Sequence, residues 1–74
     1  MRFLERRRCH LCEDAWAVLA GVSTTEGVER VDIDHDDDLV AEYGLRIPVL
    51  LSDDGTVIAE GRFDADALAA VLGG

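Results

Sequence analysis

Two extended segments joined by one amphipathic helix occupy the first half of the chain, and this order restricts the fold more than any other feature. Residues 1–6 place Phe3 and Leu4 among polar neighbours, which predicts a short first strand. From Cys9 onward, apolar residues recur at three- and four-residue spacing for roughly three helical turns. The residues of this apolar face are Leu11, Ala15, Val18, Leu19 and Val22. Residues 28–36 alternate apolar and polar side chains like a half-buried strand, so the two strands should lie parallel in one sheet.

The second half of the chain predicts a short helix, a hairpin and a final helix. Residues 35–44 contain three consecutive aspartates, any of which can cap a helix. Residues 48–62 hold two apolar runs around a DDGT turn, which predicts an antiparallel hairpin. Asp64 or Asp66 can cap the last helix, whose apolar side consists of Ala67, Leu68, Val71 and Leu72. The order is βαβαββα, which predicts an α/β fold with a four-stranded mixed sheet flanked by helices.

The length of the chain bounds its domain organisation. With 74 residues and no internal repeat, linker or low-complexity stretch, residues 1–74 are predicted to form a single domain. A chain of this size buries only about 60% of the surface that it exposes when unfolded, so we expect modest stability.

Charge is distributed unevenly along this acidic chain, whose net charge is −9. Four of its seven basic residues, all arginine, lie within residues 1–8, whereas fifteen of its sixteen acids lie beyond them. We expect no nucleic-acid partner, because phosphate backbones require a broad basic face. No apolar run approaches the ~20 residues of a membrane span, and the N-terminus lacks the apolar stretch of a secretory signal. We therefore expect no membrane partner, a cytoplasmic location and a monomer.

Cys9 and Cys12 form a C-x-x-C pair that follows the predicted first strand and opens the predicted helix. This placement within a βαβ pattern indicates a redox motif. Unpaired backbone N–H groups and the helix dipole favour a thiolate at the first cysteine of such a pair. We therefore expect Cys9 to attack a target disulfide and the less accessible Cys12 to resolve the mixed disulfide. A structural staple is a poor explanation, because this spacing closes too small a loop.

Three arginines, Arg6, Arg7 and Arg8, stand directly before the first cysteine. Arg8 is the candidate substrate-binding residue among them. Its guanidinium could raise the positive potential near the sulfur of Cys9, or it could capture a substrate carboxylate. An equally good interpretation is that the triplet is only the solvated end of a strand.

The residues CHLC at the start of the first helix and the later stretch VDIDHDDDLVAEYGLRIPVLL resemble the small glutaredoxin-like proteins of the thioredoxin fold. The resemblance implies that Cys9 is the nucleophilic cysteine and Cys12 the resolving one. It also implies that Pro48 is a cis proline beside the active site, and that the Ile47 backbone pairs with the backbone of a bound thiol substrate. The chain has EGRFD where glutaredoxins carry a Gly-Gly pair followed by an acid. Glutathione and another small thiol therefore both stay open as co-substrate.

These patterns favour a thiol–disulfide oxidoreductase that acts on disulfide-bearing proteins or on mixed disulfides with a small thiol, without a bound cofactor. A non-catalytic binding module on the same scaffold is the alternative. A third hypothesis, metal or iron–sulfur carriage through Cys9 and Cys12, needs ligands from another subunit or from small thiols. We predict no metal site within the chain, because His35 would have to reach His10 from a different part of the sheet.

Two further side chains bear on the surroundings of the cysteine pair. His10 is expected to be exposed and to modulate the thiols rather than to bind a ligand. Trp16 lies one turn beyond Cys12, so it either packs near the disulfide or covers the edge of the helix.

Overall fold

A single mixed sheet with the strand order β2-β1-β3-β4 organises the computed structural model, which describes residues 1–73. The strands are β1 (Arg2–Glu5), β2 (Glu29–Asp32), β3 (Val49–Leu51) and β4 (Val57–Glu60). The helices are α1 (His10–Val22), α2 (Asp37–Tyr43) and α3 (Ala65–Leu72), and a short 3-10 helix, η1 (Ile33–His35), precedes α2. β1 pairs with β2 in parallel and with β3 antiparallel, and β3 pairs antiparallel with β4. The predicted α/β fold with a four-stranded mixed sheet is confirmed.

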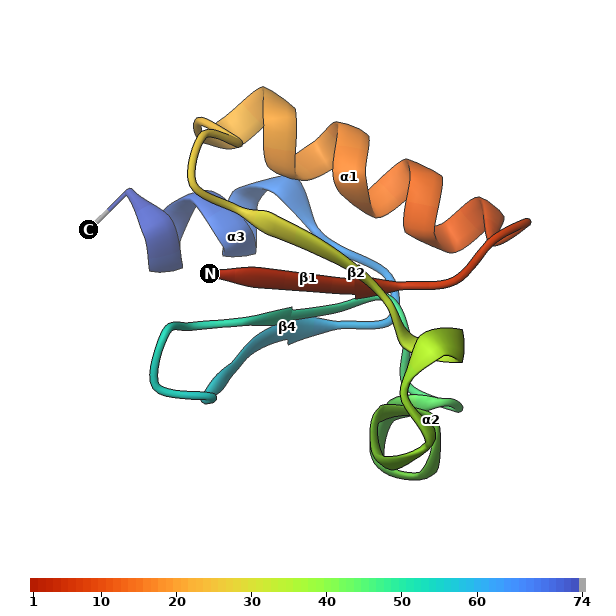
Figure 1. Ribbon diagram of the computed structural model, residues 1–74. Helices are drawn as coiled ribbons and strands as arrows, with labels where there is room; N and C mark the ends of the chain where they lie inside the picture. The colour runs from red at the N-terminus through yellow and green to blue at the C-terminus, as the bar shows by residue number, and fades with distance from the viewer. Residues whose placement is uncertain (74) are drawn as a thin grey trace.

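The helices cover the two faces of the sheet unequally, as Figure 1 shows. Helices α1 and α3 lie against one face and contact each other, whereas α2 and η1 lie together on the opposite side. Alternation along β1 supplies both cores, because Phe3 and Leu4 point to opposite faces. The core under α1 and α3 consists of Phe3, Ala15, Leu19, Leu50, Phe63 and Leu68. The core on the side of α2 consists of Leu4, Ile33, Val49 and Leu51.

Aspartates begin two of the helices, and the structure shows which of the candidates do so. Asp36 caps α2 by accepting hydrogen bonds from the backbone N–H groups of Asp38 at 2.9 Å and Leu39 at 3.2 Å. Asp64 caps α3 by accepting from the Asp66 N–H at 3.1 Å. Both side chains satisfy N–H groups that the first helical turn leaves without an intrahelical partner.

The second strand is shorter than predicted. It ends at Asp32, whose side chain accepts a hydrogen bond from the Asp34 N–H at 3.0 Å and caps η1. Ile33 is fully buried, as expected of the alternating pattern, but it lies in the 3-10 helix rather than in a strand. Alternation alone does not distinguish a strand from a tight turn that directs the same side chain into the core.

Three residues assigned to apolar helix faces, Leu11, Ala67 and Val71, are exposed. Leu11 is 42% exposed, because the first turn of α1 extends past the end of β1 and has no sheet beneath it (Figure 1). Val71 is 62% exposed, since α3 is anchored to the core through Leu68.

Candidate redox site

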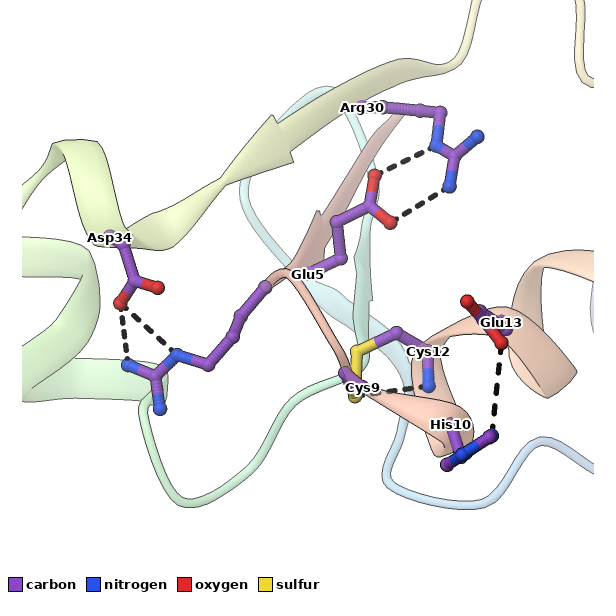
Figure 2. The surroundings of a disulfide bond; sticks show 8 residues. Glu5, Cys9, His10, Cys12, Glu13, Arg30 and Asp34 are labelled. Atoms are coloured by element: carbon purple, nitrogen blue, oxygen red, sulfur yellow. Dashed lines mark hydrogen bonds and ion pairs between the residues drawn. A yellow bond between two sulfur atoms is a disulfide. The ribbon is translucent and has the colours of Figure 1, made fainter.

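The two cysteines form a disulfide at the start of α1, on the loop that leaves β1 (Figure 2). Their Cα atoms lie 5.1 Å apart, a normal separation for a disulfide. Cys9 is the N-cap residue of the helix and has an extended backbone, whereas Cys12 lies within the first turn. The C-x-x-C motif therefore lies at the start of a helix, as predicted.

The two sulfur-bearing residues differ in accessibility. Cys12 is buried, with 1% of its surface exposed, whereas Cys9 is partly exposed. The backbone N–H of Cys12 donates a hydrogen bond of 3.1 Å to the Cys9 Sγ, which therefore occupies the position of a capping oxygen. An N–H group aimed at this sulfur and the positive end of the α1 dipole both stabilise negative charge there. Cys9 thus has the access and the electrostatic setting of the reactive member of the pair.

The three arginines before Cys9 differ in their contacts. The Arg6 guanidinium pairs with the Asp34 carboxylate, with an N–O distance of 2.9 Å, and so ties the loop after β1 to η1. Arg7 and Arg8 are exposed, and neither makes an ion pair or side-chain hydrogen bond within residues 1–73. Arg8 also has a φ of +57°, in the left-handed region that side chains with a Cβ seldom adopt.

A second arginine pair borders the site on the side of β2. The Arg30 guanidinium donates two hydrogen bonds, of 2.7 and 2.8 Å, to the Glu5 carboxylate (Figure 2). These hydrogen bonds raise the pKa of Arg30 above its usual value. The same guanidinium lies 4.2 Å from the ring centre of Trp16, which makes an edge contact with Phe3. Trp16 therefore covers the edge of α1, which was the second of the two positions considered for it from the sequence.

The segment before β3 reaches the same end of the sheet. The Ile47–Pro48 peptide bond is cis, and the Pro48 side chain is fully buried. Because Leu4 is aligned with Val49, Pro48 lies where β1 ends and the chain turns toward Cys9. The Ile47 N–H donates to the Tyr43 carbonyl at 3.1 Å, and no hydrogen bond within residues 1–73 uses the Ile47 carbonyl. Of the Ile47 backbone groups, the carbonyl is therefore the one that remains for pairing with another chain.

The loop that follows β4 is held to this segment. The Gly61 N–H donates to the Pro48 carbonyl at 2.8 Å and to the Arg46 carbonyl at 3.2 Å. The Arg46 side chain pairs with Glu60 at 2.7 Å, which lowers the pKa of Glu60 and raises that of Arg46. These contacts fix the backbone on both sides of Pro48.

Each histidine lies near one carboxylate of its own segment. The His10 side chain is 98% exposed and lies 3.8 Å from Glu13, and His35 is an exposed residue 3.7 Å from Asp32. Within residues 1–73, no three His, Cys, Asp or Glu side chains gather as a group able to hold a metal ion.

The contacts of Arg6 and Arg30 were not found from the sequence. Their partners, Asp34 and Glu5, are 28 and 25 residues away along the chain. The parallel alignment of Glu5 with Asp32 explains the first contact, because it places Arg6 and Asp34, which follow the two strands, close to each other. The ion pair between Arg6 and Asp34 could therefore be predicted only if the register of β1 against β2 were known.

Comparison with known families agrees with this geometry. The model of the Glutaredoxin-like domain (DUF836) matches residues 1–73. The chain belongs to this glutaredoxin-like family. The resemblance noted from the CHLC motif is thereby confirmed.

A solved structure supports the same assignment for this glutaredoxin-like domain. The Northeast Structural Genomics target protein XcR50 from X. campestris is 38% identical in sequence and superimposes with a TM-score of 0.85. The match covers 97% of this chain and 93% of the X. campestris chain. A search of curated proteins finds no significant match. Within residues 1–73, none of the helices is both long and apolar enough to cross a bilayer.

Proposed function

We propose that this glutaredoxin-like domain is a thiol–disulfide oxidoreductase in which Cys9 is the nucleophile and Cys12 the resolving residue. The observation that carries the proposal is the Cys9–Cys12 disulfide itself, which joins a partly exposed cysteine at a helix N-terminus to a buried one. Family membership and the C-x-x-C pair support a redox role.

The reaction follows from the two positions. In the reduced protein, the Cys9 thiolate attacks one sulfur of the substrate disulfide, and the other sulfur leaves as a thiolate that takes up a proton. The Cys12 thiol then loses its proton and attacks the Cys9 Sγ, which releases the second substrate sulfur and forms the Cys9–Cys12 disulfide. Two molecules of a reducing thiol, either glutathione or another small thiol, then return the protein to the dithiol: the first forms a mixed disulfide with one cysteine, and the second releases it as the disulfide of the small thiol. Two electrons pass from the cysteine pair to the substrate in each cycle.

The segment at Pro48 is the proposed docking site for the substrate backbone. Ile47 would accept a hydrogen bond through its free carbonyl, and the buried Pro48 holds this segment at the end of β1. Arg8, beside the nucleophile, would face the incoming substrate. The substrates are disulfide-bearing proteins or mixed disulfides with a small thiol, and the proposed setting is a reducing compartment, the cytoplasm, with the protein as a monomer.

Replacing each cysteine separately tests this function. Reduction of a model disulfide should be abolished in Cys9→Ser, whereas Cys12→Ser should accumulate a mixed disulfide at Cys9 or keep only monothiol activity. The Val71→Ala variant is the control and should keep the wild-type rate, because that side chain is 62% exposed on α3 and takes no part in the proposed site. Equal rates for the wild type and the double serine variant would reject the proposal and leave the binding-module alternative.

A further inference from the structure

The loop between β1 and α1 carries two arginines that the fold does not use. Of the seven arginines, Arg6, Arg30 and Arg46 are paired with carboxylates. Arg7 and Arg8 have no such partner within residues 1–73, although the chain contains sixteen acids. Both stand within two positions of Cys9. Two arginines without an ion pair within residues 1–73 therefore immediately precede the proposed nucleophile in a protein whose net charge is −9.

The backbone conformation at Arg8 is unfavourable for a residue with a side chain. Elsewhere in residues 1–73, the positions with positive φ are occupied by glycine, namely Gly27, Gly55 and Gly61. Arg8 is the one described residue with a Cβ in this region, at φ +57°. Glycine adopts this conformation without steric cost, whereas other residues do not. The Arg8 side chain makes no ion pair or side-chain hydrogen bond within the described chain that would offset this cost.

The surroundings of Arg7 leave its charge available. A cavity of about 260 Å³ is lined by Glu5, Arg6, Arg7, Arg30 and Asp32. The carboxylate of Glu5 is engaged by Arg30, and Asp32 accepts the Asp34 N–H. Arg6 is neutralised by Asp34. Arg7 is thus the arginine of this lining that pairs with no carboxylate within residues 1–73.

We propose that Arg7 and Arg8 select disulfides that carry carboxylate groups close to the reacting sulfur, an inference that rests on the proposed oxidoreductase function. Guanidinium groups bind carboxylates through paired hydrogen bonds and keep their charge at every physiological pH. Without these two residues, the acidic remainder of the protein would repel an anionic substrate. Such carboxylates occur in acidic protein segments and in small carboxylate-bearing thiols.

The first test measures the potential at the Cys9 sulfur without requiring turnover. In the reduced Cys12→Ser variant, Cys9 is alkylated by anionic iodoacetate and, separately, by neutral iodoacetamide. A change in the thiolate fraction of Cys9 alters both alkylation rates by the same factor, so it cancels in their ratio. A change in the charge near Cys9 alters mainly the rate with anionic iodoacetate, so it changes the ratio. The ratio of iodoacetate to iodoacetamide rates should fall roughly three- to tenfold when Arg7→Gln and Arg8→Gln are added together.

Arg2→Gln is the matched control, because Arg2 is also exposed and makes no ion pair among the described residues 1–73, but lies at the opposite end of β1. That variant should leave the ratio unchanged, and about 1 M salt should reduce the effect of the Arg7 and Arg8 substitutions. An unchanged ratio in the double arginine variant would overturn the proposal. If the Cys12→Ser background fails to fold, the reduced wild-type protein supports the same comparison, with modification at Cys9 identified by peptide mapping.

The second test distinguishes the sources of the carboxylate. Reduction of anionic dithiodipropionate is compared with that of neutral hydroxyethyl disulfide, and an acidic peptide disulfide is compared with its amide-substituted counterpart. Because leaving thiols differ in acidity, the measure is the change in kcat/KM between wild type and variant for each substrate. A larger loss of kcat/KM for the anionic member of a pair supports selection for carboxylates, and the pair that shows it identifies the source as a small thiol or an acidic peptide. Equal losses for both members would refute it while leaving the oxidoreductase function intact, and absence of turnover with every substrate would refute that function.

Discussion

The backbone N–H of Cys12 donates a hydrogen bond to the sulfur of Cys9, at 3.1 Å, within the first turn of α1. The contact therefore links the two cysteines in addition to their disulfide. A thiolate at Cys9 accepts such a hydrogen bond more strongly than a neutral sulfur does. The local backbone of α1 is therefore arranged to hold charge on the more accessible of the two sulfurs.

The first prediction concerns the relative reactivity of the two thiols. In the fully reduced protein, Cys9 should be alkylated at least about tenfold faster than Cys12, because reactive thiols are accessible thiolates and Cys12 is 1% exposed. Time-resolved alkylation followed by mass spectrometry of the two peptides measures both rates. Faster modification of Cys12 would reverse the assigned roles.

The second prediction concerns the core that supports α1. Phe3 is fully buried and makes edge contacts with Trp16 and Phe63, with ring centres 5.1 and 6.0 Å apart. Phe3→Ala should lower the free energy of unfolding by about 3–5 kcal/mol, measured by urea denaturation. Leu45→Ala is the control, because Leu45 is 104% exposed and should change stability by less than about 0.5 kcal/mol. Similar losses for the two variants would contradict the packing described here.

The third prediction concerns the backbone before the nucleophile. Arg8→Gly should raise the free energy of unfolding, by up to about 1 kcal/mol, because glycine adopts a φ near +57° without a Cβ clash. Arg7→Gly removes the same charge at a position without positive φ and should bring no gain. Thermal or urea unfolding of both variants gives the comparison, and a destabilised Arg8→Gly would show that the side chain has a structural contact.

The fourth prediction concerns pH and the turn between β3 and β4. Hydrogen bonds from the Ser52 hydroxyl and the Thr56 backbone N–H lower the pKa of Asp54 from 3.8 to about 2. A carboxyl group whose pKa is lower in the folded state contributes stability above its unfolded pKa, and this contribution is lost as the pH falls toward the folded value. The wild type should therefore exceed Asp54→Asn in urea midpoint at pH 5, and the difference should narrow as the pH approaches 2. A difference that stays constant over this range would mean that Asp54 does not titrate as described.

Most of the element order was predictable because it depends on neighbours a few residues apart. Periodicity along α1 and the position of Cys9 before it are local features, as are the aspartates that begin α2 and α3. Element ends were less predictable. Ile33 continues an alternating pattern yet belongs to η1, because the turn after β2 directs it into the same core as a strand residue would occupy.

The sequence by itself determined that a strand, a C-x-x-C pair and a helix follow one another, because capping and helical periodicity act over a few residues. Only the tertiary structure decided what the arginine triplet does. The parallel register of β1 and β2 brings Asp34 to Arg6, whereas Arg7 and Arg8 pair with no carboxylate in the part of the chain that the structure describes. The carboxylate that neutralises Arg6 is 28 residues away in the chain. The pairing of the strands therefore decides which of these arginines is neutralised, and the order of residues around the cysteines does not.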